Sequence, residues 1–97
     1  MLKQWQSLKP WKMSKLIFSK RAWEEYLYWQ TEDRKTLKRV NALLKDIERN
    51  GHEGIGKPEL LKYLDNNQWS RRIDDVNRLV YELREGFIEI IQCKGHY

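Results

Sequence analysis

The hydrophobic pattern changes its period at Gly51, and this change restricts the chain to a fold that mixes helices and strands. Before Gly51, apolar residues recur at intervals of three and four: Leu37, Val40, Leu44 and Ile47. That spacing predicts a helix with one apolar face, which Gly51 ends because glycine adopts a left-handed backbone without steric cost. After Gly51, apolar and polar residues alternate, which predicts strands.

A strand and a first helix precede this helix in the predicted order. Residues 15–18, Lys-Leu-Ile-Phe, favour a strand, and Ser19 is a suitable N-cap for the helix that follows. The residues expected to face the core from this first helix are Trp23, Tyr26, Leu27 and Gln30. Residues 31–33, Thr-Glu-Asp, are expected to cap the second helix.

Four strands are predicted after Gly51. A short strand at 60–64 and a turn at 65–67 come first, and strands at 69–74, 78–84 and 87–93 follow, with tight connections at 74–77 and 85–86. One strand, two helices and a run of antiparallel strands make an α+β domain with both helices on one sheet face. The first strand is expected to join the later sheet.

Two arginines are predicted to share the sheet face that points away from the helices. Burying Leu79 and Tyr81 directs Arg78 outward, because side chains alternate along a strand. On the preceding strand the same alternation directs Arg72 outward and Arg71 towards the helices, where Arg71 must pair with a carboxylate or reach water. The geometry of Arg72 and Arg78 fits either a bound anion or a solvated face with carboxylates nearby, and it does not choose between them.

The net charge is +5, and Lys3, Lys9 and Lys12 supply three of these charges, which leaves +2 for residues 14–97. Any nucleic-acid site must therefore come from local clusters. The tightest clusters are Arg71-Arg72 with Arg78, and the group Arg34, Lys35, Lys38 and Arg39. Five Trp and five Tyr serve core packing and also offer surfaces on which bases can stack.

The composition excludes several classes of protein. A single cysteine, Cys93, excludes an intrachain disulfide, and no apolar run approaches the roughly 20 residues of a membrane span. The chain start lacks the apolar region of a secretory signal, so a cytoplasmic protein is expected. Residues 1–13 are expected to be an N-terminal extension, either a basic aromatic arm that touches membrane or RNA or a disordered segment, and residues 14–97 the domain.

Two apparent motifs lack residues that their chemistry requires. Gly51-x-x-x-x-Gly56-Lys57 resembles a phosphate loop, but Pro58 stands where Ser or Thr would bind magnesium, and a helix precedes it instead of a strand. Cys93-x-x-His96 lacks a second pair of metal ligands, so no metal site is predicted. A Ser-His or Cys-His nucleophile pair has no supporting elbow or oxyanion motif.

A carboxylate, cations and an imidazole remain: Glu59, the arginines and His96. This combination suits metal-free cleavage of a phosphodiester. A base takes the proton from the 2′-hydroxyl, an acid protonates the departing 5′-oxygen, and cations stabilise the charge that builds on the phosphate. RNA supplies its own nucleophile, so this chemistry requires no metal or cofactor.

Several separated segments resemble the YoeB toxins of the RelE superfamily. They are the Lys-Leu-Ile-Phe-Ser of 15–19, Tyr-Leu-Tyr-Trp-Gln of 26–30, Gly-Lys-Pro-Glu of 56–59, Trp-Ser-Arg-Arg-Ile of 69–73, Asn-Arg-Leu-Val-Tyr of 77–81 and the final His-Tyr. The resemblance covers residues 14–97. It implies a RelE-like (barnase-like) fold, a small antiparallel sheet with two N-terminal helices on one face. It also implies a type II toxin that cleaves mRNA in the ribosomal A site and so inhibits translation.

The resemblance also assigns roles to residues and names partners. It implies Glu59 as general base, His96 as general acid and Arg78 as the transition-state arginine, with Tyr97 completing the catalytic set. Arg72 is then expected to bind phosphate, and the weaker candidates for RNA contacts are Arg71, Lys57 and Lys62. The implied partners are a YefM/Phd-like antitoxin, the 70S ribosome with its mRNA, and a second copy of the chain. Leu60 departs from the family, in which proline usually follows the glutamate.

Three functions therefore compete. They are a ribosome-dependent endoribonuclease, a non-catalytic RNA-binding module that uses the same arginines, and an antitoxin partner or repressor on the same fold. The set Glu59, Arg78, His96 and Tyr97 favours the nuclease. A binding module has no need of the carboxylate, and a mere partner has no need of the terminal His-Tyr.

Overall fold

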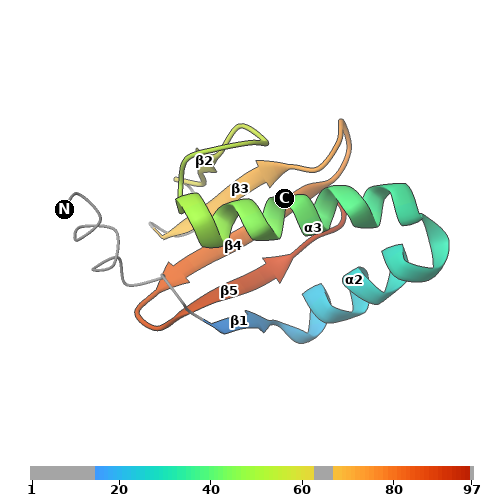
Figure 1. Ribbon diagram of the computed structural model, residues 1–97, viewed down its shortest axis with the longest axis horizontal. Coiled ribbons are helices and arrows are strands. Elements are labelled where there is room, and N and C mark those ends of the chain that lie inside the picture. Colours follow the sequence, from blue (N-terminus) through green and yellow to red (C-terminus); the bar gives the residue numbers. More distant parts are fainter. Residues whose placement is uncertain (1–14, 63–66, 97) are drawn as a thin grey trace.

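A five-stranded sheet with two helices on one face makes up the part of the chain that the computed structural model describes, residues 15–62 and 67–96 (Figure 1). The elements are β1 (Lys15–Phe18), α2 (Lys20–Glu32), α3 (Arg34–Asn50), β2 (Glu59–Leu60), β3 (Gln68–Arg72), β4 (Arg78–Arg84) and β5 (Phe87–Gln92). The order across the sheet is β1-β5-β4-β3-β2. Strands β2 to β5 pair antiparallel as expected, whereas β1 runs parallel to β5, so the sheet is mixed.

The two helices begin at the predicted caps. The Ser19 hydroxyl accepts a hydrogen bond from the Ala22 N–H at 3.0 Å and donates one to the Ile91 carbonyl at 2.8 Å, so it starts α2 and also ties it to β5. Asp33 caps α3 through the Thr36 N–H. Gly51 ends α3 with a φ of 70°, as the sequence predicts.

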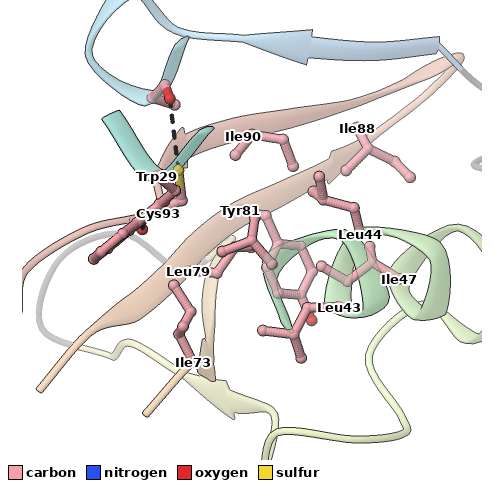
Figure 2. Close-up of a cluster of buried hydrophobic side chains, with 12 residues drawn as sticks. Trp29, Leu43, Leu44, Ile47, Ile73, Leu79, Tyr81, Ile88, Ile90 and Cys93 are labelled. Carbon is pink, nitrogen blue, oxygen red and sulfur yellow. Dashed lines mark hydrogen bonds between the residues drawn. The ribbon is translucent and has the colours of Figure 1, made fainter. Parts of the chain in front are cut away.

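The core lies between the helices and one sheet face (Figure 2). Its strand residues include the pair Leu79 and Tyr81 that the alternation predicts, and its α3 residues are Val40, Leu43, Leu44 and Ile47. The stripe predicted for α3 is therefore correct, with Leu43 added and Leu37 only partly buried. Non-polar area removed from water here is the main source of stability.

The predicted core face of α2 is wrong in part. Trp23 is 48% exposed and Leu27 39%, whereas Ala22 and Trp29 are buried. The helix is rotated about its axis relative to the prediction. The Trp29 indole N–H donates to the Cys93 carbonyl at 2.8 Å, and Ser19 bonds β5 at the other end, and these contacts fix the rotation. Aromatic residues occur on both sides of this helix, so periodicity alone leaves its rotation open.

Among the described residues, the strand predicted at 60–64 begins one residue earlier and ends sooner, and residues 63–64 of that prediction lie outside the described part of the chain. The structure has β2 at Glu59–Leu60, and the ladder ends where the Leu61 N–H donates to the Gln68 carbonyl at 2.8 Å. The predicted turn at 65–67 lies almost entirely outside the described residues. Strand β3 ends at Arg72, before the predicted residue 74, because the N–H groups of Ile73 and Asp74 both donate to the Asn77 carbonyl.

An irregularity between β4 and β5 directs the end of the chain. Tyr81 pairs with Ile90, but the preceding residue Val80 pairs with Gln92, so β5 carries one extra residue. This bulge reverses the alternation of β5. Cys93 consequently turns into the core beside Ile90 instead of away from it.

No helix among the described residues is long and apolar enough to cross a membrane. The expected boundary between an extension at 1–13 and the domain lies outside the described residues.

Candidate functional site

Arg72 and Arg78 are directly opposite each other on neighbouring strands, as the alternation predicts. They point to the sheet face away from the helices, because Leu79 and Tyr81 of β4 face the core. The Arg78 guanidinium donates through Nη1 to the carbonyls of Asp74 at 2.7 Å and Asn77 at 3.1 Å, so the β3–β4 turn orients it. Two cations therefore lie side by side at the end of the sheet, where they favour an anion between them.

Glu59 lies on the same face as the two arginines. It pairs with Ser70, which precedes Arg72 by two residues on β3, and residues two apart on a strand share a face. The Glu59 side chain is exposed, as are Lys57 in the preceding loop and Lys62 after β2. The strand register thus brings an exposed carboxylate to the face that carries both arginines.

The loop before Glu59 is fixed to the sheet and the core. The Arg72 N–H donates to the Gly56 carbonyl at 2.7 Å. Gly56 has a φ of 82°, which favours glycine, and a Cβ there would lie 2.8 Å from the end of the Leu43 side chain and 3.2 Å from the Arg72 carbonyl. Lys57 follows with a φ of 49°, an uncommon conformation for a residue with a side chain. These contacts determine where β2 begins.

Arg71 is buried and has no exposed atoms that could contact a phosphate of RNA, so it is no longer a candidate for that contact. It is 0% exposed, and its guanidinium donates to the Asp46 carboxylate and to the carbonyls of Gly51, Glu53 and Ile55. Burial alone would raise the pKa of Asp46, but hydrogen bonds, first among them that from Arg71, hold it below the usual value. The sequence correctly predicted that Arg71 turns towards the helices, and of the two alternatives left open there, a carboxylate partner or a path to water, the structure has the carboxylate.

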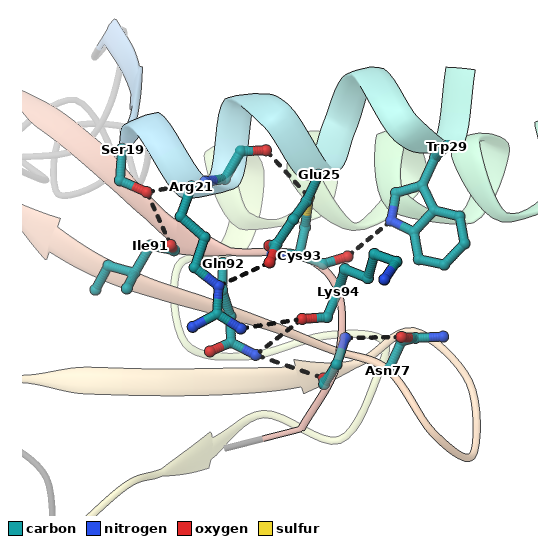
Figure 3. Close-up of polar contacts among 11 residues, drawn as sticks. Ser19, Arg21, Glu25, Trp29, Asn77, Ile91, Gln92, Cys93 and Lys94 are labelled. Atoms are coloured by element: carbon teal, nitrogen blue, oxygen red, sulfur yellow. Dashed lines mark hydrogen bonds and ion pairs between the residues drawn. The ribbon is translucent and has the colours of Figure 1, made fainter. Parts of the chain in front are cut away.

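The chain reaches His96 along a tail that two parts of the protein hold (Figure 3). On one side, the Glu25 carboxylate accepts the Cys93 N–H at 2.8 Å. On the other side, the Arg78 N–H donates to the Gly95 carbonyl at 2.9 Å. His96, which is exposed, therefore follows the residue bonded to the Arg78 backbone. Tyr97 lies outside the described residues.

The residues that hold this tail were not singled out in the sequence. The shorter bonds come from Glu25 and Trp29 of α2 and Asn77 of the β3–β4 turn. Arg21 and Gln92 add longer bonds of 3.3 to 3.4 Å to the carbonyls of Lys94 and Gly95. An Asp-x-x-Asn sequence before Arg78 is a signal for a turn whose side chains bond its own backbone, but nothing local indicates that it would also hold the chain end. Within residues 15–62 and 67–96, no three His, Cys, Asp or Glu side chains gather as a metal site.

Comparison with known proteins gives consistent matches along this fold. The model of the YoeB-like toxin of bacterial type II toxin-antitoxin systems matches residues 18–97. Toxin YoeB of Escherichia coli K12 is 46% identical over 83 residues, which are 86% of this chain and 99% of that protein.

Solved structures agree with the sequence matches. A YoeB dimer from Staphylococcus aureus is 48% identical, with a TM-score of 0.82 over 87% of this chain and 98% of that one. A heterotetrameric YoeB-YefM toxin-antitoxin complex from the same organism is 48% identical and has a TM-score of 0.80 over the same shares of both chains. The similarity spans all the elements that carry the candidate site.

Proposed function

Because the chain belongs to the YoeB-like toxins of bacterial type II toxin-antitoxin systems, we propose that it is an endoribonuclease that cleaves mRNA in the ribosomal A site and so inhibits translation. The observation that carries this proposal is the arrangement around Arg78. Arg72 lies directly opposite it, Glu59 shares its sheet face, and the residue before His96 is bonded to its backbone.

In the proposed reaction, the Glu59 carboxylate takes the proton from the 2′-hydroxyl of the nucleotide before the scissile bond. The freed oxygen attacks phosphorus, and the bond to the 5′-oxygen of the next nucleotide breaks. His96 donates its proton to that leaving oxygen. The products are a 2′,3′-cyclic phosphate and a 5′-hydroxyl.

The cations act on the charge that this reaction creates. Arg78 stabilises the extra negative charge on the phosphate oxygens in the transition state, an effect favoured by the two backbone carbonyls that orient its guanidinium in advance. Arg72 binds the phosphate in the ground state. Lys57 and Lys62 contact the RNA backbone, and Tyr97 helps to orient the substrate.

We propose the same partners that the relatives show. Structures of the Staphylococcus aureus relative contain a YoeB dimer and a YoeB-YefM heterotetramer. This chain is accordingly proposed to form a homodimer and to bind a YefM-like antitoxin, whose acidic segment would lie on the face of Arg72 and Arg78 and block the site.

Primer extension on a message translated by purified 70S ribosomes tests the proposed function. Added protein is expected to cut within the A-site codon and to leave a cyclic phosphate. A 2′-deoxy nucleotide before the scissile bond removes the nucleophile and should abolish cutting at that position. Binding to ribosomes or RNA without any cut would instead support the non-catalytic RNA-binding module.

A further inference from the structure

Gly95, the residue before His96, is bonded on both sides of its backbone by two adjacent residues. Its N–H donates to the Asn77 side-chain carbonyl at 2.7 Å, and its own carbonyl accepts the Arg78 N–H at 2.9 Å. Figure 3 shows the Asn77 side chain meeting the tail from the opposite side to Glu25. One short segment of the β3–β4 turn thus holds the tail and also carries the arginine of the site.

The Asn77 amide is itself fixed by Asp74. Its Nδ2 donates to both Asp74 carboxylate oxygens, at 3.2 and 3.1 Å, which leaves Oδ1 to accept from Gly95. Asp74 also accepts the backbone N–H groups of Val76 and Asn77 at 2.8 and 2.6 Å. Asn77 therefore presents its oxygen in one orientation, and reorienting it would break several hydrogen bonds.

The helix side of the tail is held two residues earlier, at Cys93. Its N–H donates to the Glu25 carboxylate and its carbonyl accepts the Trp29 indole N–H, each at 2.8 Å. Beyond Cys93 the tail reaches Gly95, whose φ is +85°, so the backbone there has the freedom of glycine. Two side chains bond the Gly95 backbone, and the bond to Asn77 at 2.7 Å is much shorter than the one that Gln92 Nε2 donates to the Gly95 carbonyl at 3.4 Å.

We propose that Asn77 is a positioning residue that sets where His96 stands relative to Arg78. This role rests on the proposed function, in which His96 donates a proton and Arg78 stabilises the phosphate. In this role Asn77 acts through the Gly95 backbone and requires no contact with the RNA. Its side-chain bond to the Gly95 N–H adds to the backbone bond between Arg78 and Gly95, and together they fix the direction in which the chain continues to His96. A misplacement of about 1 Å can lower a catalysed rate on the order of 10²-fold.

Asn77→Ala tests this role, with Val76→Ala as the matched control. Val76 lies in the same turn, is 66% exposed and keeps its backbone bond to Asp74 after the change. Single-turnover cleavage on programmed ribosomes is expected to slow by about 10-fold or more in Asn77→Ala at saturating protein, with half-saturation unchanged. Val76→Ala should cleave at the parental rate.

Amide hydrogen exchange of Gly95, measured by NMR on the free protein, gives a readout that does not depend on RNA. Asn77→Ala should speed exchange at Gly95 and leave the amides of the β4 core unchanged. The double variant Asp74→Asn with Asn77→Asp exchanges the carboxylate and the amide, so an acceptor for Gly95 remains. It should restore slow exchange at Gly95 and most of the cleavage rate. If Asn77→Ala does not fold, the proposal is tested with this double variant instead.

Two outcomes would overturn the positioning role: unchanged Gly95 exchange in Asn77→Ala, or faster exchange with an unchanged cleavage rate. His96→Gln is assayed in parallel. If His96→Gln cleaves at the parental rate, the proposed acid is wrong, whatever Asn77 does. If His96→Gln is inactive and Asn77→Ala is not impaired, the proposed function stands and the positioning role falls.

Discussion

Arg71 of β3 and Asp46 of α3 form an ion pair in the interior, with the arginine side chain 0% exposed and the carboxylate side chain 17%. The same guanidinium binds three carbonyls of the loop that follows α3, at Gly51, Glu53 and Ile55. The Asp46 carboxylate also accepts the Ile55 N–H at 3.1 Å. The pair therefore fixes the loop that leads to Glu59, although neither member lies on the face of the candidate site.

Arg71→Met is expected to destabilise the fold strongly. The change leaves Asp46 without its cation and three loop carbonyls without their donor, and breaking a buried pair in this way costs about 3–5 kcal/mol. The free energy of unfolding from urea titration measures the effect. Arg72→Met is the matched control, because Arg72 is the next residue on the strand and is exposed. Equal midpoints for the two variants would contradict a structural role for Arg71.

The stability of the fold is expected to fall between pH 6.5 and about 4 because of His52. Its ring stacks on Trp69 with 3.9 Å between centroids, and Nδ1 lies 3.4 Å from the Tyr81 hydroxyl. Burial, and then the nearby charge of Arg71, lower the pKa of His52 from 6.5 to about 4. In this window the unfolded chain binds a proton that the folded protein excludes, so acidification favours unfolding by up to about 1.4 kcal/mol per pH unit.

Urea titrations at several pH values between 7 and 4 measure this slope. His52→Gln should flatten it relative to the parental protein measured under the same conditions. The lowered pKa values of Asp33, Asp46 and Asp74 add to the slope only at the acidic end of the window, where unfolded carboxyl groups with a pKa of 3.8 begin to bind protons. A slope that survives in His52→Gln would assign the effect to another group.

The main features of the sheet could be predicted because they follow from local periodicity. Alternation along β3 and β4 suffices to set Arg72 opposite Arg78 and to turn Arg71 inward, since a shift of one residue would expose Leu79 and Tyr81. The helix caps were also predicted, because an N-cap depends on bonds within four residues.

Contacts between distant parts of the chain could not be predicted in the same way. The rotation of α2 depends on bonds such as that between Trp29 and Cys93, 64 residues apart. The anchoring of the tail by Glu25 spans 68 residues, and it also depends on the β5 bulge that turns Cys93 inward. A single sequence contains no local pattern that indicates contacts between residues so far apart.

Arg78→Ala and His96→Gln are each expected to lower cleavage on programmed ribosomes by about 10²-fold or more. The first removes the group that stabilises charge on the phosphate, and the second removes the proton donor. Arg84→Ala is the matched control for Arg78, because Arg84 lies at the other end of β4 and its guanidinium pairs with Glu82 at 2.9 Å. If either site variant cleaves as fast as Arg84→Ala, that residue has no catalytic role.

Deleting Tyr97 alone is expected to reduce growth arrest sharply on expression, without lowering the melting temperature. The deletion leaves in place the bonds that hold the tail at Cys93 and Gly95. Loss of activity with an intact fold would therefore report on the site and not on stability. Tyr97→Phe separates the two parts of the side chain, because it keeps the ring and removes the hydroxyl. Full growth arrest by the truncated chain would show that the terminal tyrosine is not part of the site.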